Sequence, residues 1–299
     1  MIPAPFDYAR PASLDEALDL LAGADPSIRV LAGGQSLIPL MKLRLARPER
    51  LVDVGRIDEL RGIRDRPDGG MSIGALTTWA ALLDDPRIRR YGMLADALPQ
   101  IGDVQVRNRG TIGGSLAHAD PTSDIAAPAL ALDLELVARS AARGQRVIAA
   151  TKFFTGPFTT ALEPDEILTE VRIPPGDAAA GSAYAALPQL ASGYPIAGVA
   201  VVLFRSPSSP AAPAAPAAPA APGAYSRCLV GVTGVGDHPY RAVEVERAVV
   251  AGASFSDAAQ EIATAQRVAA DIHADREYRA AMAVVMARRA LDAALARLG

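Results

Sequence analysis

The sequence turns on two glycine-rich stretches, Ala32-Gly33-Gly34-Gln35-Ser36-Leu37 and Thr111-Ile112-Gly113-Gly114-Ser115, each of which combines two glycines with a hydroxyl residue. Glycine lacks a Cβ atom and adopts positive φ without strain, so the backbone can turn sharply and bring its N–H groups against a ligand. Successive N–H groups form an anion-binding nest, and a hydroxyl adds a further donor. One such loop suits one phosphate, and two converging loops suit a pyrophosphate. The pair therefore predicts a dinucleotide site.

Neither stretch matches the better-known phosphate-binding motifs. The chain has no G-x-x-x-x-G-K-[ST] sequence, and neither stretch has the G-x-G-x-x-G spacing of a Rossmann fold. The run 231–236 comes closer, but its spacing is wrong, and an apolar strand with a glycine turn explains it better. A single Gly-Gly-x-Ser is more often a tight turn than a ligand site, so the prediction depends on the two stretches acting together.

Composition argues against several classes of function. Half of the 299 residues are hydrophobic, which is enough for the cores of two ordinary domains, and the formal net charge is −3. Neither this charge nor the small share of aromatic residues, 5% of the chain, suits binding to nucleic acid. No apolar stretch qualifies as a membrane span, and the N-terminus does not resemble a signal peptide. We therefore expect a cytoplasmic protein that binds no nucleic acid.

Metal-binding residue types are sparse. The single cysteine, Cys228, cannot hold an iron–sulfur cluster, which takes about four thiolates, and its apolar neighbours predict a buried strand. The histidines, His118, His238 and His273, lack the spacing of a zinc site. We therefore expect no metal on this chain, and any redox centre would be a bound organic cofactor.

The first part of the chain is predicted to alternate short helices with short strands. Ser13 is the predicted N-cap of a helix over 13–22, with Glu16 three residues later and Gly23 at its end. Strands are predicted at 28–31, 51–54, 71–75 and 165–173, and helices at 78–83 and 93–99. We expect residues 1–175 to form one domain with two lobes, 1–55 and 56–175.

Residues 180–299 are predicted to form a small sheet packed on helices. Apolar runs at 182–205, clearest at 196–204, and at 227–235 predict strands, and helical spacing of apolar residues predicts helices at 241–252, 256–270 and 277–298. The Pro-Ala-Ala repeat at 207–223 has little to bury, which predicts an exposed, disordered insertion between two strands. An α+β architecture fits these elements better than a doubly wound sheet.

Several stretches together resemble the FAD-binding medium subunit of molybdenum hydroxylases, the carbon monoxide dehydrogenase and xanthine dehydrogenase family. The resemblance covers nearly the whole chain and rests on both glycine-rich stretches with their flanks, 32–45 and 106–117, and on the stretches 5–8, 13–17 and 166–174. It implies a two-lobed FAD-binding domain of the PCMH/VAO type, followed by a smaller C-terminal domain of sheet and helices.

In that family the two loops clasp the pyrophosphate of FAD. The resemblance assigns this contact to Ala32, Gly33, Gly34, Gln35, Ser36 and Leu37, and to Thr111, Ile112, Gly113, Gly114 and Ser115. The glycines would allow close backbone approach, and the hydroxyls would donate hydrogen bonds. Asp124 corresponds to a family acid that contacts the nucleotide end of FAD. The alternative is that Asp124 caps a helix over 126–132.

Two further residues are implied near the flavin ring. Tyr194 matches a family aromatic beside the isoalloxazine, where it could stack and exclude water, although packing at the start of a strand explains it equally well. Leu168 corresponds to an apolar position near the flavin and also suits the core. Many relatives carry a lysine after the residue that matches Tyr184, whereas this chain continues Ala-Ala-Leu-Pro-Gln without a cation. The acceptor side of the site therefore departs from the family pattern.

His118 and Asp120 follow the second stretch and look like a catalytic pair. No third group or nucleophile accompanies them, which argues against side-chain catalysis. The redox centre would be the flavin itself, with no catalytic side chain.

The resemblance also implies partners. A large molybdopterin subunit would oxidise the substrate, a small subunit would carry two 2Fe–2S clusters, and FAD on this chain would pass the electrons to an acceptor, in a dimer of heterotrimers. Two alternatives stay open: a free-standing FAD-dependent oxidase or dehydrogenase, which would need a base near the flavin, and a non-catalytic nucleotide-binding assembly module.

Overall fold

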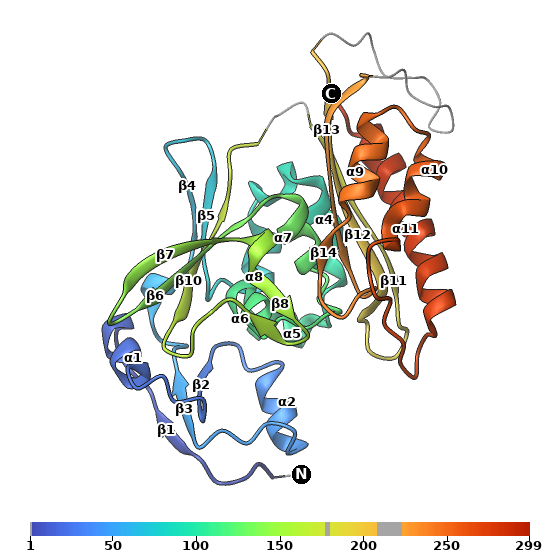
Figure 1. Cartoon of the computed structure of the whole chain (residues 1–299). Coiled ribbons are helices and arrows are strands. Elements are labelled where there is room, and N and C mark those ends of the chain that lie inside the picture. The colour runs from blue at the N-terminus through green and yellow to red at the C-terminus, as the bar shows by residue number, and fades with distance from the viewer. Residues whose placement is uncertain (1, 177–179, 208–222) are drawn as a thin grey trace.

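The structure is a computed structural model that describes residues 2–176, 180–207 and 223–299, and it is an α+β fold built on three main sheets (Figure 1). The predicted fold class is therefore confirmed. None of the described helices is both long and apolar enough to cross a membrane.

The N-terminal sheet is parallel, with strand order β1-β3-β2. Its elements are β1 (Asp7–Ala9), α1 (Leu14–Leu21), β2 (Ile28–Leu31), α2 (Leu37–Lys42) and β3 (Arg50–Asp53). Helix α1 forms as predicted, because the Ser13 side chain accepts the Glu16 N–H and the apolar residues bury one face of the helix. Strand β2 leads directly into the first glycine-rich stretch.

The middle sheet is antiparallel, with strand order β4-β5-β10-β6-β7. Its strands are β4 (Ile63–Asp65), β5 (Met71–Gly74), β6 (Glu135–Ser140), β7 (Gly144–Ala149) and β10 (Ile167–Ile173). The helices beside it are α3 (Trp79–Asp84), α4 (Gly92–Ala97), α5 (Val104–Arg109), α6 (Ile112–His118), α7 (Ala126–Ala131) and α8 (Ala150–Phe153), and a small hairpin joins β8 (Phe154–Gly156) to β9 (Thr159–Thr160).

The C-terminal sheet is antiparallel, in the order β11 (Gly181–Pro188), β12 (Pro195–Arg205), β13 (Tyr225–Thr233) and β14 (Tyr240–Arg241). Helices α9 (Val243–Val250), α10 (Phe255–Ala259) and α11 (Arg276–Ala296) lie on one face, and α4 and α7 lie on the other (Figure 1). Because helices cover both faces, β12 is apolar along nearly its whole length. Cys228 is buried in β13, as predicted.

Two predictions for the C-terminal part need comment. The helix predicted at 256–270 is wrong beyond residue 263: α10 ends at Ala259 and is followed by a short 3-10 helix, Gln260–Ala263. The later chain turns instead, because the Asp271 carboxylate accepts two following N–H groups and the Ala269 N–H donates to Val235. Most of the Pro/Ala-rich insertion at 207–223 lies outside the described residues, but its flanking strands, β12 and β13, are antiparallel neighbours.

Candidate functional site

A cavity of about 720 Å³ lies where the N-terminal part, the middle sheet and the tip of the β11–β12 hairpin meet. This volume is in the range of small-molecule and cofactor sites. Most of its lining comes from five segments far apart in the chain, within 28–40, 110–118, 123–124, 158–168 and 192–194. The cavity therefore depends on the packing of all three parts.

The first glycine-rich stretch presents open backbone donors to this cavity. The N–H groups from Gly33 to Leu37 donate no hydrogen bond to any residue that the structure describes. Gly34 has a φ of +75°, a left-handed conformation that other residues rarely adopt, and it reverses the chain ahead of α2. A row of free N–H groups around a left-handed residue is the geometry of an anion-binding nest.

The second stretch is not a loop of this kind. It is the first turn of α6, where the Ile112 N–H donates to Thr77 O at 3.1 Å, the Gly113 N–H to Ala75 O at 2.9 Å and the Gly114 N–H to Thr111 Oγ1 at 3.2 Å. The expectation of a second backbone nest is therefore wrong. Ile112 is also buried in the core and does not line the cavity.

Glycine is needed at Gly33 and Gly113 for close packing within the protein. A Cβ on Gly33 would lie 2.1 Å from the carbonyl oxygen of Arg109, and a Cβ on Gly113 would lie 2.4 Å from the Cβ of Ala75. A Cβ on Gly114 would lie 3.5 Å from the Cβ of Ala32. The first stretch therefore meets the second and the residues just before it, and both stretches line the same cavity.

Asp124 lies in the wall of the cavity that faces the C-terminal sheet. Its Oδ1 accepts a 2.7 Å hydrogen bond from the hydroxyl of Tyr184 on β11. Burial raises the pKa of the Asp124 carboxyl to about 7, although the bond from Tyr184 acts in the opposite direction. Asp124 is not the N-cap of α7, since that position belongs to Ile125.

Tyr194 stands at the rim of the cavity, in the turn between β11 and β12, and is 45% exposed. Gly193, with a φ of +77°, makes this turn, and the Gln189 side chain accepts the Ser192 N–H at 2.6 Å. Leu168 is buried in the core and also lines the cavity, and its place beside a flavin stays a prediction.

His118 and Asp120 do not form a hydrogen-bonded pair. The Asp120 carboxylate instead accepts the N–H and the hydroxyl of Thr122, at 2.9 and 2.6 Å. The His118 ring packs beside Phe158, with 5.3 Å between ring centroids, and burial lowers the pKa of the imidazole. Among the described lining residues, His118 and Arg29 are the only basic ones.

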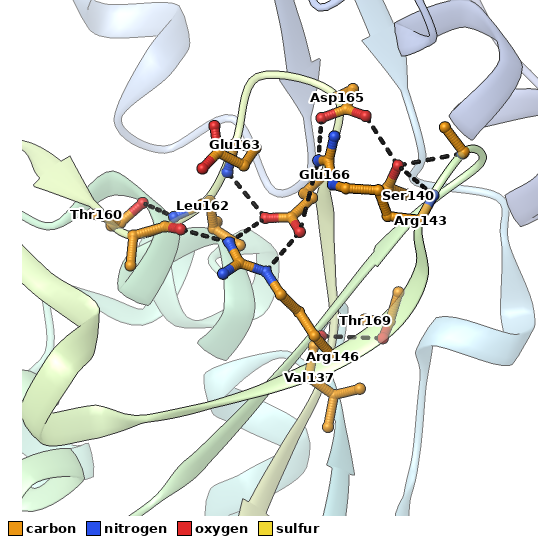
Figure 2. A network of polar contacts seen from close by, with 12 residues as sticks. Val137, Ser140, Arg143, Arg146, Thr160, Leu162, Glu163, Asp165, Glu166 and Thr169 are labelled. Atoms are coloured by element: carbon orange, nitrogen blue, oxygen red, sulfur yellow. Dashed lines mark hydrogen bonds and ion pairs between the residues drawn. The ribbon is translucent and has the colours of Figure 1, made fainter.

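A cluster of two buried carboxylates and two half-exposed arginines lies beside the cavity, which Glu163 and Glu166 help to line (Figure 2). The Glu166 carboxylate accepts two 2.7 Å hydrogen bonds from Arg146 and one of 2.8 Å from the Glu163 N–H. Burial works against the charge of Glu166, but these bonds outweigh it and lower the pKa of the carboxyl. Asp165 is held in the same way by Arg143 and by Ser140. The sequence analysis did not find this cluster, and the only signal for it was the pair of adjacent acids before β10.

Comparison with known proteins places this arrangement in a class of flavoproteins. Residues 4–176 match the family described as the FAD binding domain in molybdopterin dehydrogenase. The chain belongs to the family of FAD-binding medium subunits of molybdopterin dehydrogenases, the molybdenum-containing dehydrogenases that the sequence resembles.

Several relatives match over nearly their full length. The carbon monoxide dehydrogenase medium chain of Hydrogenophaga pseudoflava is 37% identical over 99% of both chains. The glyceraldehyde dehydrogenase medium chain of Sulfolobus acidocaldarius is 35% identical over 93% of this chain and 92% of its own. The solved structure of carbon monoxide dehydrogenase from Hydrogenophaga pseudoflava superposes with a TM-score of 0.90 at 37% identity, covering 100% of both chains.

Proposed function

We propose that this chain binds FAD in the 720 Å³ cavity and is the electron-transfer subunit of a heterotrimeric molybdenum hydroxylase. The observation that carries the proposal is the row of free N–H groups from Gly33 to Leu37 on a cavity within an FAD-binding domain. A pyrophosphate carries two negative charges, and hydrogen bonds from backbone N–H groups to charged oxygens are the stronger kind.

The two glycine-rich stretches would contribute unequally to binding of the pyrophosphate. We assign the pyrophosphate mainly to the backbone of Gly33–Leu37, with hydroxyl groups from Ser36, Thr111 and Ser115 as additional donors. The second stretch would contact the pyrophosphate through side chains only, because its backbone N–H groups already donate hydrogen bonds within the protein. The flavin supplies the redox chemistry when it is bound, and this chain's residues hold and orient it.

Asp124 and Tyr194 belong to one end of the cavity. Both side chains line the cavity, and the segments that carry them meet the end of β13: the Gly234 N–H donates to Pro121 O, and a Cβ on Gly234 would lie 2.5 Å from the carbonyl oxygen of Pro195. If Tyr194 covers the flavin ring, as the resemblance implies, Asp124 would accept hydroxyl groups close to the ring rather than at the far nucleotide end. Ala32 and Leu37 would then contact the middle of the cofactor, and Leu168 would pack against it.

We further propose that the remaining redox centres belong to partner chains. This chain has a single, buried cysteine, and an iron–sulfur cluster needs about four thiolates. A small 2Fe–2S subunit and a large molybdopterin subunit would supply them, in a dimer of heterotrimers. The relatives named above are medium chains of such dehydrogenases, which supports this assignment.

The test is an absorbance spectrum of the purified chain, followed by release and identification of the cofactor. We expect flavin bands and close to one FAD per chain, and co-purification with two partner chains when all are co-expressed. A free-standing oxidase would turn over without partners. A colourless chain that takes up no added FAD, even when it is co-expressed with the partners, would overturn the proposal.

A further inference from the structure

One arginine of the last helix connects two walls of the cavity. Arg279, near the start of α11, is 2% exposed and is the only basic side chain among the buried residues of the described ranges. Its Nη1 donates to the carbonyl of Ile196 at 2.8 Å and to the carbonyl of Gly234 at 2.6 Å. A single guanidinium nitrogen therefore holds the start of β12 against the end of β13.

The Ile196 carbonyl belongs to the wall that carries Tyr194. Ile196 is the second residue of β12, and Tyr194 immediately precedes that strand. No residue with a Cβ fits at Gly234, because that atom would lie 2.5 Å from the carbonyl oxygen of Pro195. By bonding Ile196 and Gly234 at this closely packed junction, Arg279 therefore fixes the point at which the β11–β12 turn leaves the sheet.

Gly234 and its neighbour Thr233 bond the chain segment just before Asp124. The Gly234 N–H donates to Pro121 O at 2.8 Å, and the Thr233 hydroxyl lies 2.9 Å from Pro121 O and 3.0 Å from Ser123 O. Asp124 follows directly. The segment that carries Tyr194 and the segment that carries Asp124 are thus both connected, through Ile196 and Gly234, to the buried guanidinium of Arg279.

The cost of burying this cation indicates a role in position rather than in stability. An arginine removed from water loses several kcal/mol of solvation, and apolar residues of similar volume often replace buried ion pairs without loss. Arg279 is only partly compensated: Nη2 lies 2.8 Å from Asp271 Oδ2, but neither Nη2 nor Nε makes a directed hydrogen bond within the described residues.

We propose that Arg279 is a positioning residue of the FAD cavity, which sets the distance between the wall of Tyr194 and the wall of Asp124. The inference rests on the proposed function, since it concerns how tightly that cavity holds FAD. A binding site loses affinity when the residues behind its contacts are left loose. Arg279 therefore acts through Ile196 and Gly234 and does not touch the cofactor itself.

The experiment compares Arg279→Met with Arg241→Met in the apo-chain. Arg241 is a matched control: it also ties the C-terminal sheet to the middle part, by bonds to Leu130 O and Asp133, but it bonds neither the start of β12 nor Gly234. FAD binding is titrated by flavin fluorescence at a temperature where all variants are folded, and the visible circular dichroism of bound FAD reports on its surroundings.

We expect Arg279→Met to raise the FAD dissociation constant at least about tenfold, which corresponds to about 1.4 kcal/mol, and to change the circular dichroism. Arg241→Met should lower the melting temperature with little change in either FAD readout. Arg279→Lys keeps a cationic donor and should recover part of the affinity. If Arg279→Met does not fold, Thr233→Val breaks the same connection at its far side and should weaken FAD binding without hollowing the core.

An Arg279→Met chain that melts earlier but binds FAD as the wild type does would overturn the inference. So would equal weakening by Arg241→Met. If the wild-type chain itself bound no FAD, the proposed function would fail first, so the two failures are distinguishable.

Discussion

The two glycine-rich stretches are similar in sequence and opposite in use. From Gly33 to Leu37 the backbone N–H groups have no partner within the described chain, whereas the N–H groups of Ile112, Gly113 and Gly114 are all bonded to the protein. The first stretch is open to a ligand, and the second is the beginning of a helix. A pair of glycines therefore indicates that another group comes close to the backbone, but it does not show whether that group is a ligand or another part of the protein.

The largest effect is expected where the two stretches touch. Gly33→Ala would place a Cβ 2.1 Å from the Arg109 carbonyl oxygen, and because both atoms are fixed to the main chain, the first stretch must move away from the residues that lead into the second. We expect a loss of more than about 4 kcal/mol of unfolding free energy, which only severe strain or overpacking reaches. Urea denaturation measures it. Gly23→Ala is the control, since its Cβ would meet nothing within 4 Å. Equal stability of the two variants would show that the stretches are not in contact.

The acid beyond the second stretch should give a pH-dependent effect. The folded-state pKa of Asp124 is raised to about 7, above its ordinary value of 3.8. The folded apo-chain therefore holds this proton more tightly than the unfolded chain. Its contribution to stability is fully present below about pH 4 and is lost as the pH rises through 7.

Asp124→Asn removes that titration and keeps an oxygen for Tyr184. Relative to this variant, the wild-type apo-chain should lose on the order of 4 kcal/mol between pH 4 and pH 7, at about 1.4 kcal/mol per pKa unit. Denaturation curves across this range provide the measurement. Parallel pH profiles for the two chains would contradict the raised pKa.

A smaller loss is expected from the cap of the second stretch. Thr111→Val removes the oxygen that accepts the Gly114 N–H at the start of α6. Loss of an N-cap costs about 1 kcal/mol, so the melting temperature should fall by a few degrees. Differential scanning calorimetry would detect it. An unchanged melting temperature would mean that this stretch is not held as a capped helix.

The smallest effect on stability is expected in the first stretch. Ser36 makes no side-chain cap to α2, so Ser36→Ala should change the unfolding free energy by less than about 0.5 kcal/mol. If its hydroxyl meets the pyrophosphate, FAD affinity should still fall roughly ten- to a hundredfold, since hydrogen bonds to charged groups contribute about 1.5–3 kcal/mol. Isothermal titration with FAD measures this. Stability loss with unchanged affinity would reverse the comparison between the stretches.

Local sequence signals predicted much of the fold. The Ser13 cap, the apolar strand at 196–204 and the last helix all depend on neighbouring residues, and the structure has each of them. The two glycine-rich stretches also line one cavity, as their predicted convergence requires. These features share short-range causes: capping, periodicity and the conformational freedom of glycine.

The features that the sequence did not predict depend on distant partners. Glycines at 113 and 114 disfavour a helix, yet α6 forms because Ala75 and Thr77 accept its first N–H groups. Asp165 and Glu166 look like surface charges, and only the β6–β7 hairpin brings Arg143 and Arg146 over them. Apart from the two adjacent acids, neither contact leaves a local signal, because both join residues that are far apart in the chain.

The distribution of the cavity walls along the chain has a consequence for biosynthesis. The first glycine-rich stretch is made early, whereas Thr233 and Gly234, which bond the residues just before Asp124, and Arg279, which bonds Gly234, are made much later. On a ribosome the strands of the first two sheets are complete once β10 has been made, but the segment that carries Asp124 lacks its bonds to Thr233 and Gly234 and their support by Arg279 until the last helix emerges. The cofactor would therefore be loaded only after synthesis of the chain is nearly complete, and a nascent chain stalled before α11 should stay in the apo form.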